Sequence, residues 1–319
     1  MSPLSCPPQI SEQEPLGPRT YFRIGGSAEY FTEPDSFESL TESVDWATSN
    51  SLQIQILGAG SNLLVDDLGV DGLTISLREL SNSIAVNGTS ITVGSGFMLP
   101  ALAITAASNN LSGVEFLICI PGTVGWWLCS NAGISSEASL ASVVSAVSVL
   151  DGTQLKLLEK TDIDWNYRNT SLASDNVIIV DAHLQLRTAT RETIELEMRK
   201  LLSARKATQP TAEPNAGSIF KNPPGDFAGR LIDAAGGKTL ETENARVSRM
   251  HANFITHNGR ATSSEILYLM NESQNLVKNS FGIILEPEIK WWGAGNAPEI
   301  FVVNSAWDDY HIVSVNQFM

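Results

Sequence analysis

The sequence predicts an α+β fold in at least two domains, and three observations support this prediction. Strand-like and helix-like segments alternate from Tyr21 onward. The density of glycine and proline rises after a charged helical segment that ends near residue 205. The chain has 319 residues, whereas a single core stops growing at ~250–300 residues. We therefore place a domain boundary near residue 205.

The first half of the chain supplies helices and strands that end in turns. Residues 35–49 carry apolar side chains at helical spacing, and Asp35 or Ser36 precedes them as the helix cap. The segment LQIQIL at 52–57 is a predicted strand that stops in a glycine turn. SITVGSG is a second predicted strand, and a helix over 98–111 follows it.

The second half continues the alternation. Two β-rich runs joined by Asp151-Gly152 predict a hairpin, because this dipeptide is typical of tight hairpin turns. The pattern then predicts a strand at 177–186, a charged helix at 191–207, and a β-α-β unit formed by 253–257, 262–279 and 283–292. The runs IFVVN and HIVSVNQF near the end suggest an extra hairpin.

The composition limits the classes of partner. The net charge of −15 argues against nucleic acid, since neutralising phosphates requires a clustered basic surface, although a few local cations suffice for a small anion. The three cysteines are too scattered for a disulfide framework, and the four histidines show no metal-ligand spacing, so we expect no metal. The first residues lack a signal-peptide pattern, and no apolar run approaches the ~18 residues of a membrane span, so we expect a cytoplasmic protein.

Two loops of small residues are candidates for binding phosphates. The first, GAGSN at 58–62, follows a predicted strand, and its small side chains let backbone N–H groups approach a pyrophosphate. A bulky residue at Gly60 is expected to fill that space. A dinucleotide-binding fingerprint would need a glycine where this chain has Leu63, so a simple glycine turn remains an alternative. The second loop is IPGTVG at 120–125, with NAG at 131–133 behind it. Together they fit a cradle for a long phosphate ligand.

Three further motifs carry groups that could act in catalysis. The pair Tyr167-Arg168 is suited to binding a carboxylate, because a guanidinium can bind it through two hydrogen bonds. The alternative is that Arg168 is an ordinary surface arginine. Ser218 lies shortly before Lys221 and Asn222. Three interpretations of it remain open: a nucleophile, a proton donor, or a small residue in a turn. In LEPE, Glu286 and Glu288 share one side of a strand and form either a solvated edge or a pair of acids.

These motifs occur in a fixed order along the chain. They are YFRIGGSAEYF, ILGAGSNLLV, IPGTVG with NAG, the YR pair, PNAGSIFKNP, AGRLIDAAG, VSRMHANFI and FGIILEPE. This order resembles the UDP-N-acetylenolpyruvoylglucosamine reductase family over about residues 20 to 293. The short stretch at 167–186 is similar to the family's shorter subtype.

The resemblance implies a fold in three parts. Two lobes, at about 20–85 and 86–204, would form an FAD-binding module of the vanillyl-alcohol-oxidase/PCMH type at 20–204, and a C-terminal α+β substrate-binding domain would occupy 205–300. Residues 1–19 are rich in proline and are predicted to be a loose leader, and residues 301–319 match no family motif and are predicted to be an extra tail. The resemblance further implies that FAD is held by Gly58, Ala59, Gly60, Ser61, Asn62, Ile120, Pro121, Gly122, Thr123, Gly125 and Asn131.

The resemblance also implies the activity. A protein of this family uses NADPH to reduce UDP-N-acetylglucosamine enolpyruvate to UDP-N-acetylmuramate in peptidoglycan precursor synthesis, and we expect a monomer. Arg168 would anchor the carboxylate on which negative charge develops, and Glu288 would be the acid that stabilises the enol. Ser218 would donate the proton to C2. The residues implied in binding the nucleotide sugar are Tyr167, Lys206 and Asn222.

The chain departs from the family pattern at several positions, and these departures leave other functions open. Small or cationic residues of the pattern are replaced by Trp126, Ser135-Ser136, Thr208 and Glu243-Asn244. The indole of Trp126 either intrudes on the flavin pocket or packs beneath the loop, and we favour packing. The alternatives are a degenerate paralogue that binds flavin or nucleotide sugar without turnover, and another oxidase or dehydrogenase on the same module. If the flavin were attached covalently, as in many oxidases of this class, Cys119 or Cys129 could be the attachment residue.

Overall fold

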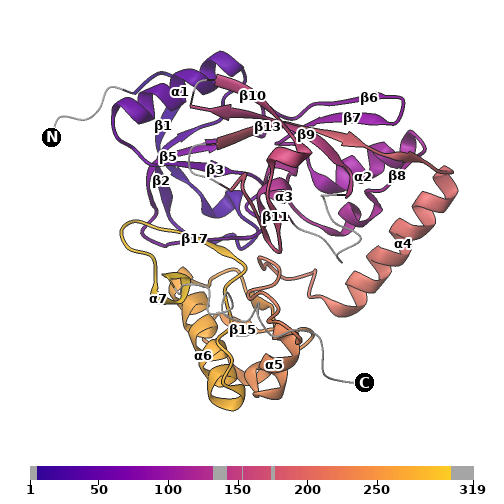
Figure 1. The fold of residues 1–319 in the computed structure, drawn as a ribbon. Helices are drawn as coiled ribbons and strands as arrows, with labels where there is room; N and C mark the ends of the chain where they lie inside the picture. The colour runs from indigo at the N-terminus through magenta and orange to yellow at the C-terminus, as the bar shows by residue number, and fades with distance from the viewer. Residues whose placement is uncertain (1–5, 132–141, 153, 174–176, 303–319) are drawn as a thin grey trace.

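The computed structural model describes residues 6–131, 142–152, 154–173 and 177–302, and Figure 1 shows their arrangement. Two β-sheets form the upper half of the molecule in this view, and a C-terminal part with helices α5 (Ala228–Ala234) and α6 (Ser263–Phe281) lies below them. The predicted α+β class is confirmed. Within the described residues, no helix is both long and apolar enough to cross a membrane.

The first sheet has four strands in the order β1-β2-β5-β3. Its strands are β1 (Ile10–Pro15), β2 (Ser27–Thr32), β3 (Ile54–Leu57) and β5 (Val70–Ser76). Helix α1 (Phe37–Ser49) begins after Ser36, whose side chain accepts a hydrogen bond from the N–H of Ser39 at 3.2 Å. The predicted helix and one of its two predicted caps are therefore confirmed.

The proline-rich start is not a loose leader over the part that the structure describes. Residues 10–15 form β1, which pairs antiparallel with β2 from Ile10–Thr32 to Pro15–Ser27. Ile10 and Leu16 are buried in the core of this lobe and hold the segment on the sheet. The residues between these two anchors, Ser11 to Pro15, include no apolar side chain except the proline, so the sequence showed no strand alternation there.

The second sheet has five strands in the order β10-β9-β13-β7-β6. Its strands are β6 (Ile84–Asn87), β7 (Ser90–Gly94), β9 (Val144–Asp151), β10 (Gln154–Glu159) and β13 (Val177–Gln185). Strands β9 and β10 form the hairpin predicted at Asp151-Gly152, with Gly152 at φ 61° in its turn. Helix α2 (Leu99–Ser108), predicted over 98–111, packs its apolar side chains into the core of this lobe.

Short elements connect the lobes and carry the site. They are β4 (Leu63–Val65), β8 (Leu111–Ser112), α3 (Val124–Ser130), β11 (Trp165–Asn166), β12 (Asn169–Thr170), β14 (Arg187–Thr188), η1 (Gly17–Arg19), η2 (Glu115–Cys119), η4 (Lys160–Asp162) and η5 (Gly237–Thr239). Helix α4 (Arg191–Thr208) confirms the charged helix and crosses to the C-terminal part at the right of Figure 1. The domain division at residue 205 stays a prediction.

The C-terminal part does not contain the predicted β-α-β unit. Strands β15 (Ala245–Val247) and β16 (Ile255–His257) pair antiparallel with each other. The predicted strand at 283–292 is a strand only as β17 (Lys290–Trp292), which pairs parallel with β4 of the first lobe. Pro287 lies in the middle of the predicted strand and lacks an N–H for a ladder, so only an isolated bridge to Phe220 forms there.

The hairpin predicted at the end of the chain lies mostly outside the described residues, and its described beginning is helical. Helix α7 (Glu299–Val302) covers the beginning of IFVVN, and the rest of that run and all of HIVSVNQF lie outside the described residues.

The core of the C-terminal part includes residues of the first lobe. Phe22, Ile24 and Leu64 are buried together with α5 and α6. The ring of His257 also makes a 2.6 Å hydrogen bond with the carbonyl of Phe22. The C-terminal part is therefore packed directly against the loop that precedes β2, and the junction between them is where the predicted site residues meet.

Candidate active site

The two predicted small-residue loops lie against each other. The Ser61 hydroxyl donates a 3.0 Å hydrogen bond to the Pro121 carbonyl. A Cβ atom at Gly58 would lie 2.6 Å from the Thr123 hydroxyl, so glycine at this position permits the contact between the loops. A cavity of about 220 Å³ opens beside them.

Gly60 is required for a different reason than the sequence suggested. It has φ +63°, and a Cβ atom there would lie 2.6 Å from the Arg19 carbonyl and 2.8 Å from the Thr20 Cα. A side chain at Gly60 would therefore collide with the backbone of residues 19 and 20, not primarily with a phosphate in the pocket. The glycine allows the loop to pack tightly on the segment before β2.

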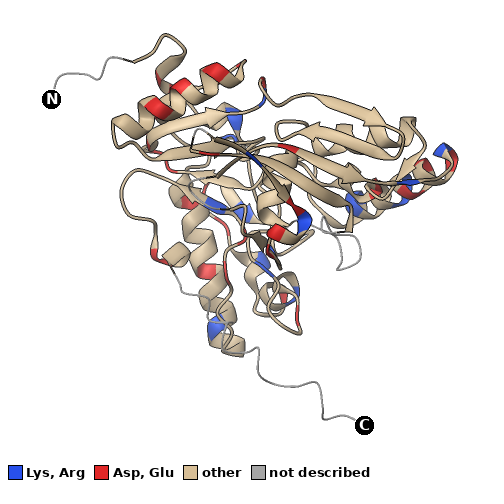
Figure 2. Ribbon diagram, turned by 45° about the horizontal axis from the view of Figure 1, so that its top comes forward, with Lys and Arg blue, Asp and Glu red and all other residues tan. Residues whose placement is uncertain are grey.

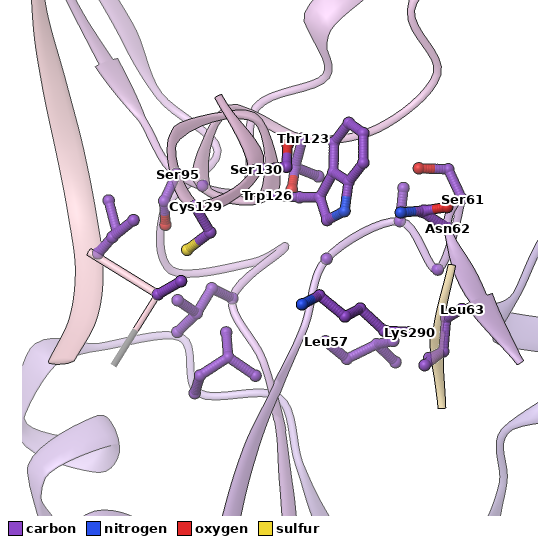
Figure 3. A pocket seen from close by; sticks show the side chains of 18 of the residues that line it. Leu57, Ser61, Asn62, Leu63, Ser95, Thr123, Trp126, Cys129, Ser130 and Lys290 are labelled. Carbon is purple, nitrogen blue, oxygen red and sulfur yellow. The ribbon is translucent and has the colours of Figure 1, made fainter. Parts of the chain in front are cut away.

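The walls of this pocket combine small, polar and aromatic side chains (Figure 3). Of the residues predicted to hold a cofactor, it is lined by Gly58, Ala59, Gly60, Ser61, Asn62, Thr123 and Gly125. The Ser95 hydroxyl is a further buried wall residue that finds no hydrogen-bond partner among the described residues. A buried hydroxyl without a partner is unfavourable, so this atom suits a ligand that completes its hydrogen bonding.

Lys290 is a wall residue that the sequence analysis missed. It lies on β17, opposite Leu63 of β4, and its side chain extends into the pocket across from Trp126 (Figure 3). Burial lowers the pKa of its ammonium group, and nearby Lys221 lowers it further. By its accessible surface Lys290 is exposed, so solvent screens part of this effect. Glu286, Glu288 and Lys290 alternate in LEPEIK, and this alternation could have identified the lysine.

The two adjacent indoles have different environments. Trp127 is fully buried in the core of the second lobe, with its ring centroid 6.1 Å from that of Phe116. Trp126 is half-buried and lines the pocket, with its ring close to Gly122. The interpretation favoured for Trp126, packing beneath the loop, holds only in part, because this indole packs against the core of the second lobe and also forms part of the pocket wall.

Cys129 also lines the pocket, but its thiol is poorly suited to attack a ligand. Burial raises its pKa to about 11, so little thiolate exists near neutral pH. Burial also raises the pKa of the Cys119 thiol. The two cysteines available for covalent attachment are therefore both weak nucleophiles.

Arg168 occupies the two-residue turn of the β11–β12 hairpin. Asn166 pairs with Asn169 across this turn, and Arg168 has φ 57°, which is uncommon for a residue with a side chain. Its Cζ lies 5.4 Å from the centre of the Tyr167 ring. Its Nε lies 3.0 Å from Oε1 of Glu288, so the hairpin brings a guanidinium to the C-terminal part.

Glu288 is held by three segments that are far apart in the sequence. Its side chain pairs with Arg168, its N–H donates to the Ile219 carbonyl at 2.7 Å, and its carbonyl accepts from the Asn62 side chain at 3.0 Å. Burial raises the pKa of its carboxyl group, and the positive charges of Arg168 and Lys221 lower it only in part. A carboxyl group with a raised pKa stays protonated to higher pH and can act as an acid.

Ser218 directly precedes the residue that binds the Glu288 backbone. It is half-buried, and its hydroxyl makes no hydrogen bond to the described residues. Next to it, the N–H of Lys221 donates to the Glu286 carbonyl at 2.9 Å, and the Lys221 amine lies 3.3 Å from the Glu286 carboxylate. The motifs predicted at 167–168, 218 and 288 thus meet at one place in the structure.

Other predicted residues lie elsewhere. Ile120 packs against the core of the second lobe, and the Asn131 side chain donates to the Asn166 carbonyl at 2.8 Å. Asn222 accepts a hydrogen bond from the N–H of Ala228 at 3.0 Å and so holds the start of α5. Lys206 lines a separate cavity at the end of α4, together with Arg246 and Met250.

The departures from the family pattern have structural uses where they are described. Thr208 donates to the Ala204 carbonyl at 2.9 Å at the end of α4. The N–H of Asn244 donates to Glu265 at 3.0 Å, and Glu243 lines a cavity away from Glu288. Ser135-Ser136 lie outside the described residues.

Comparisons with known proteins agree with this geometry. Residues 209–292 match the family model of the UDP-N-acetylenolpyruvoylglucosamine reductase C-terminal domain, and residues 28–156 match that of an FAD binding domain. UDP-N-acetylenolpyruvoylglucosamine reductase 2 of Symbiobacterium thermophilum is 43% identical over 288 residues, which cover 90% of this chain and 93% of that one. The reductase of Desulforamulus reducens is 39% identical, covering 89% and 94%. The crystal structure of the enzyme from Thermus caldophilus superposes with a TM-score of 0.77 at 33% identity, covering 88% and 98%.

Proposed function

Because the chain belongs to the UDP-N-acetylenolpyruvoylglucosamine reductase family, we propose that Arg168, Ser218 and Glu288 form its catalytic centre. The protein is an FAD-dependent oxidoreductase that uses NADPH to reduce UDP-N-acetylglucosamine enolpyruvate to UDP-N-acetylmuramate, a step of peptidoglycan precursor synthesis. The observation that supports this centre is the junction at Glu288, where segments from three parts of the chain meet.

The pocket beside the two loops fits FAD. Its glycine-rich wall exposes backbone to a ligand, the Ser95 hydroxyl lacks a partner among the described residues, and Lys290 offers a positive charge. When bound, FAD supplies the two-electron chemistry of the reaction. The residues of this chain bind and orient it, with Lys290 tuning the charge near the ring system or the diphosphate.

The roles of the catalytic residues follow from the charge that develops on the substrate. Arg168 holds the substrate carboxylate, next to which negative charge accumulates in the transition state. Glu288 in its protonated form donates a hydrogen bond to the developing enolate. Ser218 then gives its proton to C2, a carbon basic enough to take it. The Arg168–Glu288 pair is expected to open as the substrate carboxylate replaces Glu288 on the guanidinium.

A two-stage rapid-mixing experiment tests this function. The protein is first reduced with NADPH, and UDP-N-acetylglucosamine enolpyruvate is then added while flavin absorbance is followed. Fast return of the oxidised spectrum, with formation of UDP-N-acetylmuramate, is expected. A flavin that is reduced but not reoxidised by this substrate would instead indicate a protein that only binds its ligands, or a different oxidoreductase.

The FAD is expected to be bound without a covalent link. The pKa of Cys129, at about 11, leaves little thiolate in the pocket to attack the ring. Acid precipitation followed by centrifugation should leave the yellow colour in the supernatant as FAD. Colour that stays in the pellet, or FMN in the supernatant, would contradict this prediction.

The raised pKa of Glu288 predicts how the rate of substrate reduction depends on pH. The rate should fall as pH rises through an apparent pKa above the ordinary ~4.3 of glutamate, since only the protonated carboxyl acts as an acid. Lys221→Met should move this fall to higher pH, because it removes a charge that favours the carboxylate. Glu288→Gln should abolish the fall together with most of the activity.

The control for this pH experiment is Lys156→Met, because Lys156 pairs with Asp151 at the exposed β9–β10 hairpin. It should leave the profile unchanged. The free energy of unfolding gives a second measurement. The folded protein binds the proton of the Glu288 carboxyl group more tightly than the unfolded chain does, because its pKa is raised in the folded state. The free energy of unfolding should therefore fall as pH rises from the ordinary pKa of glutamate to the raised one. Melts of Glu288→Gln should lack that fall. A profile that stays in place in Lys221→Met would argue against Glu288 as the titrating acid.

We also propose that the protein acts as a monomer in the cytoplasm. The acidic composition and the scattered cysteines support this proposal. Gel filtration of the FAD-loaded protein at several concentrations tests the oligomeric state.

A further inference from the structure

Asn253, in the motif VSRMHANFI, is 3% exposed and lies beside residues 219–221, which we call the clamped segment and which directly follow Ser218. Its side-chain amide makes two hydrogen bonds with the backbone of Phe220. Oδ1 accepts from the Phe220 N–H at 2.9 Å, and Nδ2 donates to the Phe220 carbonyl at 2.8 Å. The Asn253 carbonyl also accepts from the N–H of Ile219 at 2.9 Å. A single asparagine therefore binds three backbone groups of the clamped segment.

The other edge of the clamped segment is bonded to the stretch that carries Glu288. The Ile219 carbonyl accepts from the Glu288 N–H at 2.7 Å, and the Lys221 N–H donates to the Glu286 carbonyl at 2.9 Å. Every backbone donor and acceptor from the first N–H of the segment to its last N–H thus has a partner, as buried backbone requires. Asn253 occupies the edge opposite Glu288 and replaces a neighbouring strand there.

Asn253 is itself held by its own motif. Its N–H donates to Nδ1 of His251 at 3.2 Å, and the Phe254 N–H donates to the His251 carbonyl at 3.0 Å. Burial lowers the pKa of His251, which favours the neutral ring, and a neutral ring can accept a hydrogen bond at Nδ1. The ring also lies against α5, because a Cβ atom at Gly229 would be 3.0 Å from its Cε1. The amide of Asn253 is therefore fixed before a ligand binds.

The backbone is fixed on both sides of Ser218. Before it, Gly217 has φ +78°, and its N–H donates to Oδ1 of Asn215 at 3.0 Å. After it comes the clamped segment. The Ser218 hydroxyl makes no hydrogen bond to the described residues, so only the backbone and its own rotamer place it. A proton donor must lie within ~2.6–3.2 Å of the atom that takes the proton, so this backbone determines whether the hydroxyl reaches C2.

We propose that Asn253 is a positioning residue for the reaction, because by binding the clamped segment it places the Ser218 hydroxyl for proton transfer to C2. This inference rests on the proposed role of Ser218. Glu288 has two further contacts that do not include Asn253, with the Arg168 guanidinium at 3.0 Å and with the Asn62 side chain at 3.0 Å. The effect of Asn253 therefore falls on the serine.

Asn253 carries no charge, and this separates its role from that of the ion pairs around it. Charged side chains are spread over the lobes and the C-terminal part (Figure 2), and the Lys221 amine lies 3.3 Å from the Glu286 carboxylate. A side-chain amide does not titrate, so its hydrogen bonds persist over the pH range in which Glu288 changes charge. Asn253→Ala should therefore lower the rate of substrate reduction without moving the pH at which this rate falls.

The test uses the FAD-loaded protein and measures each half-reaction by rapid mixing. Asn253→Ala should slow reoxidation of the flavin by UDP-N-acetylglucosamine enolpyruvate by ~10- to 100-fold, since a displacement of about 1 Å can cost this much, and should leave reduction by NADPH nearly unchanged. Asn258→Ala is the matched control. The Asn258 amide also bonds through both atoms, to Oδ1 of Asn244 at 3.2 Å and to the Arg260 N–H at 3.0 Å, but in the turn after β16. It should leave both rates unchanged.

A double-mutant cycle shows whether Asn253 acts through Ser218. In the Ser218→Ala background no hydroxyl is left to place, so adding Asn253→Ala should cause little further loss of the reoxidation rate. The same loss in both backgrounds, an equal loss in the two half-reactions, or a displaced pH profile in Asn253→Ala would overturn the inference. An unchanged rate in Ser218→Ala alone would overturn the proposed function itself, so the two failures are distinguishable.

Asn253→Asp keeps the inference testable if Asn253→Ala does not fold. Its carboxylate can still accept from the Phe220 N–H, but it presents an acceptor to the Phe220 carbonyl where the amide has a donor. Reoxidation should therefore be slow at neutral pH and should recover at low pH by more than it changes in the unchanged protein, because the protonated carboxyl group can donate again. A full rate in Asn253→Asp at neutral pH would contradict the inference.

Discussion

Ser218→Ala is expected to slow reoxidation of the flavin by the enolpyruvyl substrate by ~10²–10⁴-fold, the usual contribution of general acid catalysis. Reduction of the flavin by NADPH should change little, because only the step on the sugar requires a proton at carbon. The hydroxyl lies beside the segment that binds Glu288 and makes no hydrogen bond to the described residues, so its removal should not disturb the fold. Rapid mixing of each half-reaction separates the two rates.

The variant Ser218→Cys provides the matching control for Ser218→Ala. A thiol can also donate a proton and has nearly the same shape, so it should restore part of the lost rate. If instead Ser218→Ala slows both half-reactions equally, the serine has a structural role and the assignment of the proton donor is wrong. Melting temperatures of the two variants should differ little from that of the unchanged protein.

Trp127→Ala is expected to destabilise the protein by ~3–5 kcal/mol, because it removes a fully buried indole from the core of the second lobe. Thermal melts of the protein without FAD measure this loss directly. The neighbouring change Trp126→Ala should cost less stability, since that indole is half-buried at the pocket wall. It should instead weaken FAD binding, because the ligand loses an apolar surface beside the two loops.

The pair of tryptophan variants also decides the meaning of the departure at Trp126. If Trp126 is a favourable part of the pocket wall, Trp126→Ala should weaken FAD binding. If Trp126→Ala raises the melting temperature and tightens FAD binding, the indole crowds the ligand, and a weakened or altered enzyme becomes the better interpretation. Trp127→Phe, which keeps an aromatic ring near Phe116, should recover part of the stability that Trp127→Ala loses.

Local signals were sufficient for the features that depend on a few neighbouring residues. The cap at Ser36, the turn at Asp151-Gly152 and the helix at α4 follow from short patterns, and the structure contains all three. The small-residue loops were also found from composition alone, and their mutual contact at Ser61 and Pro121 agrees with the predicted cradle.

Features that depend on distant partners could not be obtained in this way. Strand β1 has only Ile10 buried among its residues, so its pairing depends on β2. The strand predicted at 283–292 was too long because Pro287 interrupts it, and the part that does form a strand pairs with β4, in another lobe. Lys290 was missed because it completes a pocket whose other walls come from distant segments, and only its alternation with Glu286 and Glu288 gave a local signal.

The pairing of β17 with β4 also affects how the chain can fold. Asn62 and Glu288 are hydrogen-bonded although they lie 226 positions apart, and bringing such distant residues together carries a large loop-closure entropy. The FAD pocket and the catalytic acid are therefore completed only when the last part of the chain has been synthesised. During synthesis on the ribosome, the two sheets can form first, while the wall that Lys290 provides is added at the end. Newly made chains should thus acquire FAD late, and a chain cut before β17 should keep its sheets but expose an open, poorly binding pocket.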